Sequence, residues 1–358
     1  MALTRLVIAS LRNIEAATLM LSPGINLISG DNGSGKTSLL EAAHVLGLGR
    51  SFRVSRHRRL IHDSHQALTV FGETEHHRLG VEKTASGDTA IRIDGTPATS
   101  VAALAQKLPL QLFDPLSLDV LTGPSQARRQ LLDWGVFHVE HGFQPVWQRN
   151  HRALKQRNSL LKSARISPIE LSAWEQELAE TAKDIERMRR TFFDAWTPFL
   201  FPALQRFLPD FDIQMDWHPG WDVEQDLLQL LHANRAKDAE RGFTQQGPHR
   251  GDLRGRVQGE VLDDRLSRGQ IKLAAFAVKL SLAGLLMSKG IRPTLLVDDL
   301  ASELDAAARR RACEALSALG TQVLLTSIEP AQVLTNWNTP EPVRTFHVEH
   351  GAVRLMSE

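Results

Sequence analysis

Apolar positions fall into two patterns along this chain. Short runs rich in branched residues, such as 25–29 and 293–297, stop at a glycine or at acids, which is typical of strands buried on both faces. Apolar residues three or four positions apart predict long helices after Ser167 and over 273–290. Strands at both ends of the chain with helices between them indicate an α/β fold that holds an inserted helical part.

The helix-rich segment covers roughly 126–208. Ser167 and Glu170 form a capping box, and the apolar period continues to Phe199, which predicts a helix of roughly 30 residues. Residues 146–161 are its expected antiparallel partner in a short coiled coil. We therefore expect an N-terminal α/β part, a helical arm domain and a C-terminal α/β part over 1–125, 126–235 and 236–358.

Composition and charge narrow the class of protein. Hydrophobic residues make up 42% of the 358 residues and charged residues 23%, as in an ordinary globular protein. The formal net charge of +1 means that any nucleic-acid site is a local patch. The single cysteine forms no internal disulfide, and no window of 18 uncharged apolar residues occurs, which predicts a cytoplasmic protein with no membrane segment.

Histidine is frequent, with 14 residues, but its spacing does not indicate a metal site. The string Phe-His-Val-Glu-His-Gly occurs at 137–142 and again at 346–351. The identity does not extend outward, so the chain has no true repeat at these places.

A glycine-rich loop follows the strand predicted over 25–29. It matches G-x-x-x-x-G-K-[ST] and leads into a helical stretch. Glycines let successive N–H groups turn inward on phosphate oxygens, while Lys36 would reach the β- and γ-phosphates and Thr37 would bind Mg²⁺. The alternative is a merely flexible loop. The expected nucleotide-binding residues are Gly30, Asn32, Gly33, Ser34, Gly35, Lys36, Thr37 and Ser38.

The run 293–297 ends in Asp298 and Asp299. A buried parallel strand delivers such carboxylates to the C-terminal edge of its sheet. Asp298 would hold Mg²⁺, and Asp299 would polarise the attacking water as the catalytic base. The alternative is a core strand followed by a solvated turn. The glycine-rich loop in the same chain disfavours this alternative, because a nucleotide site needs both motifs.

These motifs together resemble those of the ABC-type ATPases. Ser267, Gly269 and Gln270 match the signature motif, and 302–305 match the D-loop. The resemblance implies an ABC-type (P-loop) ATPase head with ATP and Mg²⁺ as cofactors. It also implies an ATP-dependent homodimer, in which the signature residues contact the nucleotide of the other subunit.

Departures from the ABC pattern imply slow hydrolysis. Asp299 stands where these ATPases usually have glutamate, and Thr326 and Ser327 stand where they have a switch histidine. The two hydroxyls are able to hydrogen-bond the γ-phosphate but carry no charge. Gln111 is the candidate for the Q-loop glutamine.

The chain between Lys36 and Ser267 is longer than in transport ATPases and too short for the coiled coils of SMC and Rad50 proteins. Segments 9–14, 49–53, 113–115, 123–129 and 247–250 resemble the RecF family of bacterial recombination mediators. The resemblance implies a cytoplasmic protein of DNA repair, replication, homologous recombination and the SOS response to DNA damage. Such a protein binds double-stranded and gapped DNA, helps RecR and RecO load RecA, and hydrolyses ATP weakly, as a DNA-stimulated switch.

A local excess of arginine indicates where DNA would bind. The candidate DNA-binding residues are Arg50, Arg53, Arg56, Arg58 and Arg59, and a solvated loop is the alternative. A second basic run in the arm, which includes Arg157, is expected to be a solvated helical face. Two other classes stay open, a transporter ATPase subunit and an OLD-type nuclease-coupled ATPase. The first needs a membrane partner, and the second needs a nuclease domain for which the residues after Asp305 are too few.

Overall fold

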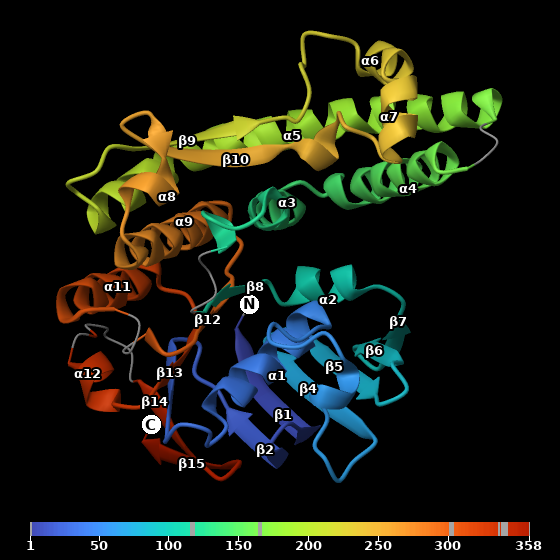
Figure 1. Cartoon of the computed structure of the whole chain (residues 1–358). Helices are drawn as coiled ribbons and strands as arrows, with labels where there is room; N and C mark the ends of the chain where they lie inside the picture. The colour runs from blue at the N-terminus through green and yellow to red at the C-terminus, as the bar shows by residue number, and fades with distance from the viewer. Residues whose placement is uncertain are drawn as a thin grey trace. The chain divides into compact units, whose positions relative to one another are not determined.

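The computed structural model describes residues 2–114, 119–163, 167–300, 304–335, 337 and 343–357 (Figure 1). The chain forms two compact units. Unit 1 consists of Met1–Ser117 and Lys279–Glu358, and unit 2 of Leu118–Val278. Unit 2 contains the residues predicted as the arm and continues past 235, because strand β9 in the arm pairs with strand β10 after it.

Unit 1 contains both predicted nucleotide motifs. Its first part holds β1 (Leu3–Leu11), β2 (Ile14–Met20), β3 (Ile25–Ser29), α1 (Lys36–Leu48), the 3₁₀ helix η1 (His57–Arg59), β4 (Ala67–Thr74), β5 (Arg78–Thr84), β6 (Thr89–Ile93), β7 (Thr96–Ala98), α2 (Val101–Lys107) and β8 (Leu110–Phe113). Its second part holds β12 (Thr294–Val297), α11 (Ala306–Leu319), β13 (Val323–Ser327), α12 (Pro330–Leu334), β14 (Arg344–Glu349) and β15 (Ala352–Ser357).

Two six-stranded sheets build unit 1. One is antiparallel, in the order β2-β1-β4-β5-β6-β7, and the other has the order β15-β14-β3-β13-β12-β8 with all strands but β15 parallel. Helix α1 contacts strands of both sheets and is buried along nearly its whole length. Strands β3, β12 and β13 are buried at every position, which is why they read as continuous apolar runs.

Unit 2 is mainly helical. Its elements are α3 (Ser125–Val139), α4 (Phe143–Leu161), α5 (Pro168–Phe207), β9 (Ile213–His218), α6 (Leu227–Ala233), α7 (Arg235–Arg241), η3 (Pro248–Arg250), β10 (Asp252–Val257), β11 (Glu260–Val261) and α8 (Leu262–Arg265). Helices α4 and α5 pack side by side, as predicted (Figure 1). The Ser167 hydroxyl caps α5 by accepting from the N–H of Glu170.

Helix α5 is longer than predicted. It runs for 40 residues and passes Phe199, where the sequence prediction ended, to Phe207. Pro198 and Pro202 lie inside it, and the fold tolerates them because Leu200, Leu204 and Phe207 continue the buried face. Packing thus overrides the local preference of proline to end a helix.

Helix α9 (Arg268–Ser288) passes from unit 2 into unit 1. Among the described helices it is the one long and apolar enough to cross a membrane by length and composition. Of its most apolar window 72% is buried within the chain, as in the core helix of a folded domain.

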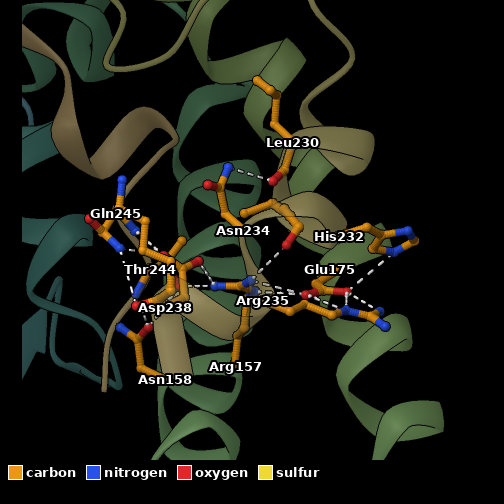
Figure 2. Close-up of polar contacts among 12 residues, drawn as sticks. Arg157, Asn158, Glu175, Leu230, His232, Asn234, Arg235, Asp238, Thr244 and Gln245 are labelled. Carbon is orange, nitrogen blue, oxygen red and sulfur yellow. Dashed lines mark hydrogen bonds and ion pairs between the residues drawn. The ribbon is translucent and has the colours of Figure 1, made fainter. Parts of the chain in front are cut away.

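A buried ion cluster ties the arm together (Figure 2). Arg157 of α4 is fully buried and donates to Glu175 of α5 at 3.0 Å and to Asp238 of α7 at 2.7 Å. Arg235 also donates to Glu175, and Arg157 donates to the Thr244 hydroxyl at 2.7 Å. The prediction that Arg157 lies on a solvated face is therefore wrong. Its position in a basic run gave no sign that acids and a hydroxyl from three other segments surround it.

Candidate nucleotide-binding site

The glycine-rich loop begins where β3 ends at Ser29. Gly30 has φ +148°, and a Cβ there would lie 2.2 Å from the carbonyl oxygen of Val348. Gly35, at the start of α1, has φ +123°. Only glycine adopts these angles without strain, so the loop turns tightly from strand to helix, as the motif predicts.

Lys36 folds back over the loop that precedes it. Its ammonium group donates to the carbonyl oxygens of Gly30 at 2.7 Å and Asp31 at 2.9 Å. Burial lowers the pKa of Lys36, and the charges of Asp299, Asp298 and Asp31 act against that shift. A phosphate oxygen placed at this ammonium would replace weak carbonyl partners with a charged one.

Thr37 and Asp298 meet at the edge of the parallel sheet. The Thr37 hydroxyl donates to Asp298 Oδ1 at 3.1 Å, and the Thr326 hydroxyl donates to the same oxygen at 2.7 Å. Burial raises the pKa of Asp298, while these two hydrogen bonds act against the rise. A hydroxyl and a carboxylate side by side are hard oxygen ligands of the kind Mg²⁺ prefers, so the donor set fits the predicted metal.

Asp299 has a left-handed backbone, with φ +50°. Its N–H donates to the Thr326 hydroxyl at 2.8 Å, which holds the peptide in place. Such a conformation in a residue other than glycine marks a site where the surrounding structure imposes it. Asp298 contacts Thr37, and both acids line the adjacent cavity.

A cavity of about 630 Å³ lies over the loop within unit 1. Most predicted nucleotide-binding residues line it, together with both acids. Its lining is Arg12, Asn13, Asn32, Gly33, Gly35, Lys36, Thr37, Ser38, Arg53, Arg59, Ile61, His62, Asp63, Asp298 and Asp299. Gly30 and Ser34 lie outside this lining, and the Ser34 hydroxyl is buried with no hydrogen-bond partner in the described chain.

The cavity is also lined by four polar residues that no sequence motif places there, namely Arg12, Asn13, His62 and Asp63. The Asn13 amide donates to the carbonyl oxygen of Ser34 at 2.9 Å, and its oxygen accepts from the Ser38 hydroxyl at 3.0 Å. Asn13 therefore braces the loop from the adjacent turn between β1 and β2. Segment 9–14 resembles the RecF family, but nothing in its composition predicts a position beside the loop.

Arg12 forms a paired contact with a buried acid. Its guanidinium donates to both carboxylate oxygens of Glu41 at 2.9 and 3.0 Å, and Glu41 is fully buried in α1. Glu41 also accepts from the Ser51 hydroxyl. The contact links the loop helix to the segment that contains the candidate DNA-binding arginines.

The predicted DNA-binding arginines do not form one uniform patch. All five are exposed, but Arg53 and Arg59 line the nucleotide cavity. Arg50, Arg53 and Arg56 line a second cavity, and Arg58 donates to the carbonyl oxygen of Asp63 at 3.1 Å. Arg53 is therefore shared between the two cavities, and its charge acts against the rise that burial causes in the pKa of Asp298.

The predicted signature residues belong to unit 2 and form a helix cap. Gln270 Oε1 accepts from the Ser267 N–H at 2.8 Å, and the Ser267 hydroxyl accepts from the Gln270 N–H at 3.4 Å. Ser267 and Gly269 are exposed at the start of α9. The Ser267 hydroxyl accepts within the cap, so its own O–H is able to donate outward. Residues 302 and 303 of the predicted D-loop lie outside the described residues.

Gln111 and Ser327 lie away from the cavity lining. Gln111, in β8, donates to the carbonyl oxygen of Lys279 at 2.8 Å. The Ser327 hydroxyl is buried at the end of β13 with no hydrogen-bond partner among the residues described. Of the two predicted switch residues, Thr326 is the one bonded to both acids, through the Asp298 carboxylate and the Asp299 N–H.

The chain is similar to known proteins over nearly its whole length. A family model described as the RecF/RecN/SMC N terminal domain matches residues 2–353. The DNA replication and repair protein RecF of Pseudomonas aeruginosa (strain LESB58) is 44% identical over 359 residues, which cover 99% of this chain and 97% of that protein. The chain belongs to the RecF family. The DNA replication and repair protein RecF of Pseudomonas putida (strain GB-1) is 43% identical and covers 99% of this chain and 98% of its own length.

Solved structures confirm the predicted fold class. The structure of "the recombination mediator protein RecF-ATPrS in RecFOR pathway" has a TM-score of 0.85 and 25% identity, covering 99% of this chain and 98% of that one. An Smc head domain derived from Pyrococcus furiosus has a TM-score of 0.61 at 14% identity, covering 99% of this chain and 96% of its own. The RecF-family fold is thus an ABC-type ATPase head with an inserted helical domain.

Proposed function

We propose that this RecF-family chain is an ATP-dependent DNA-binding recombination mediator that acts in DNA repair and replication restart. The observation that carries the proposal is the cavity over the glycine-rich loop, where Lys36, Thr37 and the two acids converge. ATP fits this cavity because its walls offer one buried ammonium group and exposed guanidinium groups for a triphosphate. The family membership supports the role in replication and repair.

Thr37 and Asp298 would hold Mg²⁺, which supplies charge to neutralise the phosphates. Asp299 would orient and polarise the attacking water from the cavity wall. Because aspartate is one methylene shorter than glutamate, hydrolysis would be slow. ATP binding would then switch the state of the protein, and hydrolysis would reset it. We expect a weak ATPase that DNA stimulates.

The exposed signature supports an ATP-dependent homodimer. The Ser267 hydroxyl, already fixed by the cap with Gln270, would donate to the nucleotide of the other subunit. Pairing two heads would place two sets of arginines from 50–59 against one duplex. RecR, RecO and RecA are the proposed protein partners at gapped DNA, and the cytoplasm is the proposed compartment.

Retention of gapped DNA tests this function. A labelled gapped duplex and a single strand are titrated with protein in Mg²⁺ with ATP, with ADP and without nucleotide. Tighter retention of the gapped duplex in ATP alone is the expected result, and the Lys36→Ala protein should lose it. Equal retention in all three conditions would overturn the ATP-dependent role.

A further inference from the structure

A second cavity, of about 630 Å³, lies next to the nucleotide cavity and shares Arg53 with it. It forms between the segment after α1 and strand β5. Its charged and titratable lining is entirely basic, and consists of Arg50, Arg53, Arg56, His57 and Lys83. The rest of its lining is small or apolar, with no acid among the described residues.

Lys83 is the unusual member of this lining. It is 3% exposed, although lysine is almost never fully buried without a paired charge. Its ammonium group contacts the Thr89 hydroxyl at 2.9 Å and His57 Nε2 at 3.2 Å, and neither partner is an acid. No carboxylate in the described part of the chain lies within ion-pair distance of Lys83, Arg50, Arg53 or Arg56.

The contact with Lys83 fixes the proton of His57. An ammonium group only donates, so Nε2 of His57 accepts and the ring carries its proton on Nδ1. That atom is buried and has no acceptor among the residues described. Buried donors are nearly always satisfied, so the Lys83 and His57 pair has positive charge and a spare donor but lacks a negative acceptor.

We propose that this cavity binds one phosphate group of a DNA strand, with Lys83 as its buried anchor. The inference rests on the proposed DNA-binding function and assigns it a specific phosphate subsite. A phosphodiester supplies the missing negative charge, and the exposed guanidinium groups of Arg50 and Arg56 at the same cavity would contact it or its neighbours along a backbone. A single free phosphate would leave those exposed arginines unused, which favours a polyanion.

The shared residue Arg53 gives the subsite a further property. Arg53 lines both cavities, so a phosphate in the second cavity and a nucleotide in the first compete for or share one guanidinium. A phosphate bound there would therefore draw on a guanidinium group that also faces the nucleotide cavity. This offers a direct route from bound DNA to the hydrolysis site.

The test compares Lys83→Met with Lys289→Met, which makes the same change at an exposed lysine outside both cavities. Duplex binding is measured over a range of salt with saturating Mg²⁺ and ATP analogue, and nucleotide affinity is measured separately. Lys83→Met should weaken duplex binding about 5- to 10-fold and reduce the salt slope by about 0.9 for each phosphate that the variant no longer neutralises, with nucleotide affinity unchanged. Lys289→Met should leave all three quantities unchanged.

A measurement on the parent protein guards against misfolding of the variant. The His57 ring signals, assigned with His57→Gln, should shift on addition of duplex DNA and stay in place with inorganic phosphate at the same phosphate concentration. A shift with inorganic phosphate alone would make the site one for a free anion and overturn the DNA assignment. No shift with either probe, or parent-like DNA affinity in folded Lys83→Met, would overturn the subsite. If the parent fails to bind DNA at all, it is the proposed function that fails.

Discussion

Thr37 Oγ1 lies 3.1 Å from Asp298 Oδ1, although 261 positions separate the two residues in the chain. The sheet order explains the contact, because β13 pairs with β3 on one side and β12 on the other. Thr326, near the end of β13, donates to the same Asp298 oxygen at 2.7 Å and so bridges the two motifs. The ligands expected for Mg²⁺ are therefore assembled by the fold itself.

Replacing Lys36 with alanine tests the phosphate-binding loop. The change removes the only ammonium group that lines the described part of the nucleotide cavity, so ATP affinity should fall by at least about 100-fold. The fold should survive, because Lys36 donates to two backbone carbonyl oxygens of its own loop, and the change leaves that backbone and its glycines in place. Equilibrium binding of a fluorescent ATP analogue is the measurement, with Lys289→Ala as the matched control. Unchanged affinity in folded Lys36→Ala would contradict the assignment.

Asp299→Asn should separate binding from hydrolysis. Asparagine tolerates the left-handed backbone at this position, and the N–H bond to Thr326 is unchanged, so the site should keep its shape. The carboxylate that would polarise water is removed, so turnover should stop while nucleotide affinity stays within about 3-fold of the parent. Sedimentation should show a longer-lived dimer in ATP. A protein that stays monomeric at saturating Mg²⁺ and ATP, parent and variant alike, would refute the composite site.

Sequence alone predicted the elements that carry local signals. The strand at 25–29, the loop, the apolar run before Asp298 and the capped start of α5 all combine an apolar pattern with a residue that ends or begins an element. The end of α5 was missed because Pro198 and Pro202 signal a stop that packing overrides. The repeated hexapeptide shows the same limit. Residues 137–139 end helix α3, whereas 346–349 belong to strand β14, so tertiary surroundings decide its conformation.

The site was predictable where one motif supplies several residues. Lys36, Thr37, Asp298 and Asp299 all line the cavity, as their motifs indicate. Arg12 and Asn13 were not predicted there. They lie in the turn between β1 and β2, which only the tertiary fold brings to the glycine-rich loop. For the same reason, the sequence did not predict that Arg53 lines two cavities. A run of arginines shows local charge but not which side chains turn to which cavity.

The buried ion cluster of the arm predicts that Glu175 and Glu177 differ greatly in how much they contribute to the free energy of unfolding. Glu175→Gln would leave Arg157 and Arg235 short of negative charge in a buried site, at a cost of about 3–5 kcal/mol in the free energy of unfolding. Glu177→Gln removes a partner of Arg149 at the surface and should cost less than about 1 kcal/mol. Urea unfolding of both variants measures the contrast. Similar midpoints would show that the cluster contributes little to stability.

His249 predicts how stability depends on pH. Burial lowers its pKa from 6.5 to about 4, and its Nε2–H donates to the carbonyl oxygen of Thr244 at 2.9 Å. The folded protein prefers the neutral ring. The contribution of His249 to the free energy of unfolding is therefore complete above pH 6.5 and disappears as pH falls toward 4. The decrease amounts to about 3 kcal/mol at most. His249→Gln should lose less stability than the parent between pH 7 and pH 4.5, and equal decreases would refute the prediction.

The arginine segment should make DNA binding depend on nucleotide. Arg56 and Arg58 are exposed and lie outside the nucleotide cavity lining, so the double change to alanine removes phosphate contacts without touching ATP. Arg53 and Arg59 are unsuitable for this purpose because they line that cavity. If a dimer neutralises about six to eight phosphates, log affinity should fall with log salt at a slope near about −5 to −7, and each Arg→Ala change should reduce its magnitude by about two.

Duplex binding from low to moderate salt, with and without ATP, is the measurement. Arg187→Ala serves as the control, since it removes an exposed arginine from the arm that pairs only weakly with Asp184 at 3.3 Å. Binding should require ATP in the parent because two heads must pair before their arginines face one duplex. Sequence preference should be absent, since phosphate contacts carry no base information. A double variant that keeps the parent's affinity and slope, beside an Arg187→Ala protein that loses them, would move the DNA site from this segment to the arm.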